Sequence, residues 1–361
     1  MTTITRTTPY DILPSVKKFM KLSKLKTGDK VAIVAPSSGL AAVFPWVYKL
    51  GLERIRNEIG LETIEYPSTK LKNASLEARA KDLMDAFADP DIKAIISTIG
   101  GSDQIRLLKY LSPETLRANP KLFFGYSDNT HLGIYLWNLG IPSYYGGSVM
   151  TQFAMQSSMD EMTISSLREA LFTDSTVPII ASETYNDIGL TWQDESNLTK
   201  KRLHQPNAGW SWDGEKDAEG VLWGGCVESL VAQFSTSIYL PNDDDITGAA
   251  LFLETGEDIP EHWIIEYLLT GMGERGWLNK FSAVLIGRPK AWEYNKQNSD
   301  PVKEKYRQDQ QTTVLRTIRM YNSEIPVVQN MDFGHTDPQT ILPVGNKVFI
   351  SSKNRQINLQ Y

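Results

Sequence analysis

Apolar residues follow two alternating patterns along the first 150 positions. Short apolar runs predict buried strands, and apolar residues recurring every three or four positions predict amphipathic helices. The expected strands cover 31–35, 62–66, 93–101 and 121–125. The expected helices cover about 46–59, 76–87, a short stretch near 105–108, and 132–139, which ends at Gly140. Strands that alternate with helices predict parallel βαβ units in an open sheet, so the fold class is α/β.

The pattern changes after residue 172. Residues 173–218 are polar and rich in turn residues, so we expect a long irregular connection that serves as a substrate loop. Ordered strands resume near 219, at 248–256 and in two later apolar runs, and the last 16 residues predict a hairpin. We therefore expect an extension at 1–24, an α/β domain at 25–172, a connecting loop at 173–218 and a strand-rich domain at 219–361.

Length, charge and composition narrow the class of protein. A chain of 361 residues with 41% hydrophobic content indicates two domains or one large α/β unit. The net charge of −6 disfavours a nucleic-acid partner. No apolar run of 18 residues or signal peptide is found, and the single cysteine, Cys226, fits a reducing compartment. The sequence therefore predicts a cytoplasmic protein without membrane contact.

The segment KLFFGYSDNT suggests a strand, a sharp corner and a helix in direct succession. Gly125 can adopt backbone angles that suit such a corner, and Ser127 would lie at its apex beside the helix N-terminus. This is the geometry of a nucleophile elbow, although the second glycine of G-x-S-x-G is missing. Local residues leave an alternative open, in which Ser127 or Asp128 only caps the helix.

Other strand ends supply candidate partners for Ser127. Strands of an open α/β sheet direct ligands to their carboxyl ends, so these polar corners should converge. His335 follows a strand and a glycine and is the best candidate base, and Glu254 ends an apolar strand and is the best candidate for its carboxylate partner. The backbone N–H groups of Asp128 and of the Gly100–Gly101 turn, Gly101 in particular, are candidate oxyanion donors.

The four histidines, at 131, 204, 262 and 335, lie far apart in sequence without metal-ligand spacing. A zinc site is therefore not expected. For any single histidine, a surface or structural role remains the alternative. Cys226 could in principle be a nucleophile, but no histidine is near it in sequence, and a small core residue is the preferred interpretation.

Seven motifs in order resemble the LD-carboxypeptidase family of serine peptidases, from about residue 24 to the C-terminus: LKTGDKVAIVAPSSG, STIGG, GYSDNT, EGVLWGGC, LFLETGE, LIGRP and FGHTDPQTILPVG. The resemblance implies a Ser-Glu-His triad at Ser127, Glu254 and His335. It also implies a parallel α/β domain joined to a domain with a mostly β core, an active site between them, a homodimer, and neither metal nor organic cofactor.

Within that family, the turn at 98–103 and the segment TWQDES look like the microcin C immunity (MccF-like) branch. That branch cleaves an aminoacyl or peptidyl group from a sulfamoyl- or phosphoramidate-linked adenosine. Trp192, Trp210 and Trp212 could stack on the adenine, or they could simply anchor the loop. Two alternatives remain: a murein tetrapeptide LD-carboxypeptidase that acts on muropeptides, and a non-catalytic ligand-binding protein on the same fold.

Overall fold

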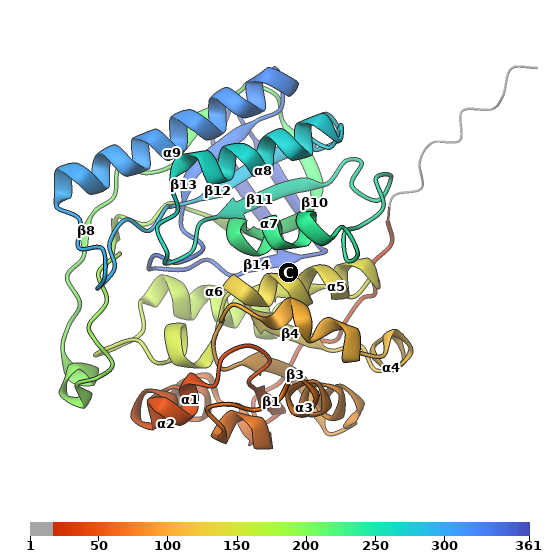
Figure 1. The fold of residues 1–361 in the computed structure, drawn as a ribbon, viewed down its shortest axis with the longest axis vertical. Helices are drawn as coiled ribbons and strands as arrows, with labels where there is room; N and C mark the ends of the chain where they lie inside the picture. The colour runs from red at the N-terminus through yellow and green to blue at the C-terminus, as the bar shows by residue number, and fades with distance from the viewer. Residues whose placement is uncertain (1–16) are drawn as a thin grey trace, which may run out of the picture.

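Two β-sheets from different halves of the chain organise the molecule. The computed structural model describes residues 17–361, so most of the expected extension at 1–24 lies outside the described residues. The first half of the chain forms the lower part of Figure 1, and the C-terminal half forms the upper part. The family fold expected from the sequence, an α/β domain joined to a second domain with a β core, is confirmed.

The first sheet has six strands in the order β14-β5-β4-β3-β1-β2. All neighbours are parallel except β14 and β5. Its strands are β1 (Lys30–Val34), β2 (Glu62–Glu65), β3 (Ile92–Ser97), β4 (Leu122–Gly125), β5 (Ser143–Tyr145) and β14 (Leu342–Val344). Strand β14 comes from the C-terminal half of the chain, so a segment far away in sequence completes the edge of this sheet.

The second sheet has eight strands in the order β6-β16-β15-β10-β11-β12-β13-β9. Strands β10 to β13 are parallel to one another, and the flanking pairs are antiparallel. The main strands are β10 (Ala218–Cys226), β11 (Ala250–Glu254), β12 (Ala283–Gly287), β13 (Val327–Met331), β15 (Lys347–Ser351) and β16 (Gln356–Gln360). The last two pair as the predicted C-terminal hairpin.

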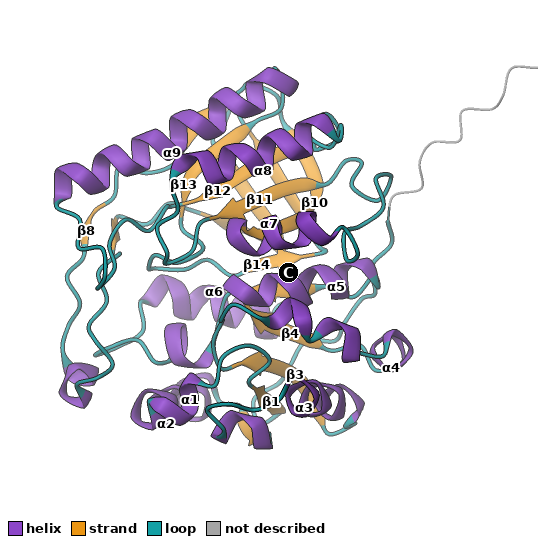
Figure 2. Cartoon of the chain, in the orientation of Figure 1, coloured by secondary structure: helices purple, strands orange, loops and turns teal. Residues whose placement is uncertain are grey.

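Helices lie against both sheets, and Figure 2 shows α7, α8 and α9 in front of the second sheet. In the first half they are α1 (Leu40–Val43), α2 (Pro45–Arg54), α3 (Leu76–Ala88), α4 (Pro113–Ala118), α5 (Thr130–Asn138) and α6 (Glu161–Phe172). In the second half they are α7 (Val227–Thr236), α8 (His262–Glu274) and α9 (Asp300–Tyr321). The helix expected at 46–59 continues past α2 as a π-helical turn, Ile55–Ile59, and the one expected near 105–108 is two 3-10 turns, Gln104–Arg106 and Leu108–Tyr110.

The connection at 173–218 is more ordered than its polar sequence suggested. It contains the short strands β6 (Thr176–Ile179), β7 (Thr184–Tyr185), β8 (Gln205–Pro206) and β9 (Ser211–Asp213). Strand β6 pairs with β16 and β9 pairs with β13, so both ends of the connection are edge strands of the second sheet. Backbone pairing with distant strands fixes these ends, and no local sequence signal reports such pairing.

Across residues 17–361, every helix is too short or too polar to cross a lipid bilayer. The start of the described chain packs against the body instead. The ring of Phe19 lies edge-on to that of Trp137, with centroids 5.3 Å apart. The Met20 N–H donates to the Gly140 carbonyl at 2.8 Å, so this segment is held by both packing and hydrogen bonding.

Candidate active site

Ser127 lies at the sharp corner between β4 and α5. Its φ of +62° is in the left-handed region, which non-glycine residues rarely occupy outside strained functional turns. A 3-10 turn, Ser127–Asn129, connects the corner to α5. The backbone is therefore held in the strained strand-to-helix geometry that exposes a nucleophile.

Gly125 serves this corner in a different way from the one expected. Its φ is not positive, so the unusual backbone angle belongs to Ser127. A Cβ on Gly125 would lie 2.7 Å from Ser97 Oγ and 2.9 Å from Asn129 Cγ. Glycine is needed here because neighbouring side chains leave no room for a Cβ.

Glu254 and His335 meet at the ends of the second sheet. Glu254 ends β11 and is 1% exposed, and its Oε2 lies 2.7 Å from His335 Nδ1. The other carboxylate oxygen, Oε1, accepts a hydrogen bond from the Tyr145 hydroxyl at 2.5 Å. Both oxygens of this buried carboxylate are therefore satisfied, which is what burial of a charge requires.

Electrostatics determine the protonation of His335. Burial alone would lower the pKa of this imidazole, but the adjacent Glu254 carboxylate, by its charge and its hydrogen bond, raises the pKa above the ordinary value of 6.5. With Nδ1 engaged by Glu254, Nε2 remains as the nitrogen able to exchange protons with a substrate. The pair is thus arranged as a base and its orienting carboxylate.

Tyr145 was not identified from the sequence, although it joins the two halves of this arrangement. It belongs to β5 and is buried, and its hydroxyl accepts the Ser127 N–H at 3.2 Å while donating to Glu254. A tyrosine in a short apolar strand resembles any core aromatic residue, so the sequence carried no signal for this role.

The candidate oxyanion loop lies directly beside the elbow. A Cβ on Gly100 would be 2.9 Å from Ser127 Cβ and 3.5 Å from the Asp128 nitrogen. The Gly101 N–H has no acceptor within the described chain, so it is available to a ligand. The Asp128 carboxylate accepts hydrogen bonds from the backbone N–H groups of Asp103, at 3.2 Å, and Gln104, at 3.1 Å, and so ties the loop to the elbow.

We expect Gly100→Ala to reduce kcat/KM by about 100-fold, the usual cost of disturbing an oxyanion site. Its new methyl group would lie 3.1 Å from Ser127 Oγ and crowd the space of the reacting carbonyl. Gly271→Ala is the matched control, because a Cβ there, within α8, meets nothing within 4 Å. Steady-state kinetics of both variants check this, and equal rates for Gly100→Ala and wild type would contradict it.

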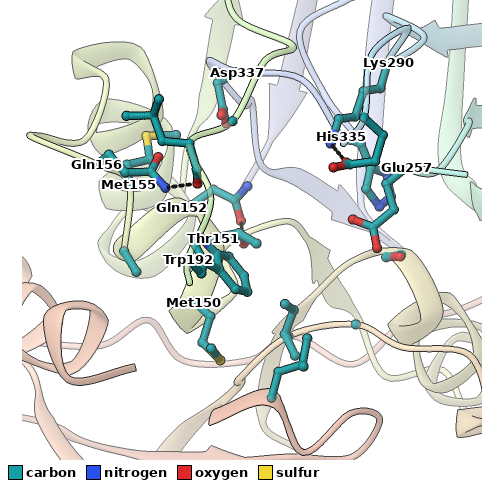
Figure 3. A pocket seen from close by; sticks show the side chains of 18 of the residues that line it. Met150, Thr151, Gln152, Met155, Gln156, Trp192, Glu257, Lys290, His335 and Asp337 are labelled. Carbon is teal, nitrogen blue, oxygen red and sulfur yellow. Dashed lines mark hydrogen bonds and ion pairs between the residues drawn. The ribbon is translucent and has the colours of Figure 1, made fainter. Parts of the chain in front are cut away.

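These groups line a cavity of about 420 Å³, whose other lining residues include both polar and apolar side chains. Ser127, His335, Gly100 and Gly101 all line it. Figure 3 shows Trp192 on one side of the cavity and His335, Glu257 and Lys290 grouped on the other. A polar catalytic edge thus faces an aromatic surface across a space that can hold a small molecule.

Of the three candidate tryptophans, only Trp192 lines this cavity. The Trp210 indole N–H donates to Asp332 Oδ2 at 2.9 Å, and Trp212 belongs to β9, opposite Val328 of β13. Of the two interpretations left open by the sequence, these surroundings favour anchoring for Trp210 and Trp212, because they attach the connection to the second sheet.

The remaining histidines and Cys226 have other surroundings. His131 is buried, and burial lowers its pKa to about 4, so it stays neutral in the core. His262 is half-buried against Thr313, and His204 lies beside Asp160. Burial raises the pKa of the Cys226 thiol, which donates to Glu228 Oε2 at 3.1 Å, so the thiol stays protonated as expected of a core residue.

Comparisons with known proteins identify the family of this chain. Family models described as the LD-carboxypeptidase N-terminal and C-terminal domains match residues 31–146 and 219–350. The chain is 26% identical over 292 residues to the microcin C7 self-immunity protein MccF of Escherichia coli, covering 80% of this chain and 79% of that protein. It is 24% identical over 345 residues to a probable murein peptide carboxypeptidase of Bacillus subtilis, covering 93% and 92%.

A solved structure is also similar. The MccF-like protein from Streptococcus pneumoniae in complex with AMP superposes with a TM-score of 0.81 at 27% identity, covering 92% of this chain and 99% of that chain.

Proposed function

This chain belongs to the LD-carboxypeptidase family of serine peptidases and is MccF-like, and from that premise we propose that it cleaves the amide between an aminoacyl or peptidyl group and a sulfamoyl- or phosphoramidate-linked adenosine. The proposed catalytic residues are Ser127, His335 and Glu254. Such a reaction would detoxify antibiotics of the microcin C type. The observation that carries the proposal is that Trp192 lines the same cavity as Ser127 and His335.

Each catalytic group has a defined task in this reaction. His335 Nε2 removes the proton from Ser127 Oγ as that oxygen attacks the carbonyl carbon, and Glu254 stabilises the resulting imidazolium. The N–H groups of Gly101 and Asp128 hold the oxyanion. His335 then protonates the leaving nitrogen, and a water molecule, deprotonated by His335, hydrolyses the acyl-enzyme and restores Ser127.

The nucleoside preference is supported by the aromatic wall. Trp192 is held in place because its carbonyl accepts the Trp46 indole N–H at 2.8 Å and Phe44 lies edge-on to its ring, with centroids 5.7 Å apart. An indole fixed in this way can stack on a base, an interaction worth about 1–3 kcal/mol. The AMP complex of the pneumococcal relative supports nucleotide binding on this fold.

Hydrolysis of a murein tetrapeptide is the second candidate, favoured by the likeness to the Bacillus subtilis protein. The test is a side-by-side assay of wild type and Ser127→Ala with an aminoacyl-sulfamoyl adenosine and a tetrapeptide ending in D-alanine. Serine-dependent cleavage of the nucleotide alone supports the proposal. Serine-dependent cleavage of the tetrapeptide alone would replace the substrate and retain the triad.

The raised pKa of His335 leads to a pH prediction. A histidine base must be neutral to accept a proton, so kcat/KM should fall as the pH drops through the His335 pKa. Because Glu254 raises that pKa, the acidic limb should lie above about 6.5, the ordinary histidine value. A pH–rate profile that stays flat from pH 5 to 8 would contradict the assignment of His335 as the base.

We propose domain limits of 25–172 and 219–361, with 173–218 as the connection. The matched family domains fall inside these limits, which supports them. The homodimer and the cytoplasmic location stay predictions, and light scattering of the purified protein would check the first.

A further inference from the structure

One charged side chain in the cavity lining lacks an opposite charge. Every other charged residue of that lining is paired within the protein: Asp187 with Lys303 and Arg307, Arg202 with Asp160 and Asp337, and Lys290 with Glu293. Glu257 makes no hydrogen bond or ion pair with any residue in 17–361, and it is exposed. Its carboxylate is therefore the one lining charge left for a ligand to neutralise.

The position of Glu257 indicates which part of a substrate it meets. It follows the turn after Glu254, and Figure 3 shows it beside His335, on the side of the cavity away from Trp192. The two parts of an amide substrate extend in opposite directions from the carbonyl carbon. If the nucleoside occupies the Trp192 side, the acyl part extends toward Glu257.

We propose that Glu257 binds the free α-ammonium group of an aminoacyl substrate, so that the enzyme prefers acyl groups with an unmodified amine. This inference rests on the proposed function and narrows its substrate class from aminoacyl or peptidyl to aminoacyl. The α-ammonium lies one carbon from the scissile carbonyl, which places it near a carboxylate that flanks His335. A charge-assisted hydrogen bond there would neutralise both groups.

The test compares alanyl-sulfamoyl adenosine with its N-acetyl derivative, in which a neutral acetamide replaces the positively charged amine; Glu257→Gln then separates the effect of charge from that of the added acetyl group. Wild type should favour the free amine by about 10-fold to 100-fold in kcat/KM, the range expected for one charge-assisted hydrogen bond. Glu257→Gln should lose most of that preference by slowing the free-amine substrate alone. Asp258→Asn is the matched control, since this neighbouring exposed carboxylate does not line the cavity.

Several outcomes would overturn the inference. Equal wild-type rates on both substrates would show that the amine is not recognised. An equal loss on both substrates in Glu257→Gln would show that Glu257 acts only through the charge of His335. If the enzyme cleaves the murein tetrapeptide but neither nucleotide, the proposed function fails and the inference fails with it. If it cleaves both nucleotides at equal rates, only the inference is overturned.

Affinities measured by calorimetry in the Ser127→Ala background separate binding from turnover. The free-amine nucleotide should bind about 10-fold more tightly than the N-acetyl form, and adding Glu257→Gln should abolish the difference. An unchanged difference would assign amine recognition to another group and contradict the proposal.

Discussion

Ser127→Ala should reduce kcat by a factor on the order of 10⁵–10⁶, because loss of a serine nucleophile removes the covalent route entirely. The remaining turnover would come from binding and the oxyanion donors alone. Rates measured with a high enzyme concentration and a purified substrate check this. A variant that keeps a tenth of wild-type activity would exclude Ser127 as the nucleophile.

The same position gives a test that separates strain from catalysis. Ser127 has a φ of +62°, which alanine tolerates no better than serine, whereas glycine adopts it freely. Ser127→Gly should therefore be as inactive as Ser127→Ala but more stable than it by about 1 kcal/mol in the free energy of unfolding. Denaturant titration of the two variants measures the difference, and equal stabilities would show that the corner is not strained.

Glu254→Gln should lower kcat by a factor on the order of 10⁴, the effect known for the carboxylate of such triads. The amide keeps the shape but cannot stabilise the imidazolium, and it no longer raises the pKa of His335. The acidic limb of the pH profile should therefore move to lower pH while the plateau falls. Stopped assays from pH 4 to 9 check both changes, and an unshifted limb would contradict the coupling.

Two neighbouring residues serve as comparisons for Glu254→Gln. Glu228 is half-buried near Glu254, and desolvation raises the pKa of its carboxyl group. Glu228→Gln removes this charge but leaves the contacts of Glu254 with His335 and Tyr145 in place, so kcat should change little. Tyr145→Phe removes one hydrogen bond from Glu254 Oε1 and the acceptor of the Ser127 N–H. We expect an intermediate loss of about 10-fold, consistent with about 1.4 kcal/mol for one hydrogen bond.

The parts of this fold with strong local patterns were predictable. The βαβ succession, the serine at the corner and the glutamate ending an apolar strand follow from periodicity and residue chemistry alone. The strand ends that carry Ser38, Gly100 and Ser127 do meet at one cavity, since carboxyl ends of parallel strands in the first sheet lie on one edge. Glu254 comes from the second sheet and reaches this site through its contact with His335. These features could be predicted without knowing which strands pair across long distances in sequence.

The features that sequence reasoning missed depend on long-range contacts. The position of Gly125 against Ser97 and Asn129, rather than its own backbone angle, explains the glycine. Tyr145 can link Ser127 and Glu254 only because β5 pairs with β4, which the sequence does not show. The pairing of β9 with β13 places Trp212, and Trp210 beside it, at the second sheet and away from Trp192. Composition alone could not divide tryptophans between a cavity and a sheet edge.

The return of β14 to the first sheet has a consequence for synthesis on the ribosome. Residues 342–344 pair with β5 of the first sheet, so the edge of that sheet forms only after residue 344 has emerged, about 200 residues after β5. His335 lies just before this strand, so this residue arrives at nearly the same time as the pairing of β14 with β5. A nascent chain that already displays the strained serine corner therefore lacks His335, and we expect no hydrolytic activity until the segment that carries His335 and β14 has emerged.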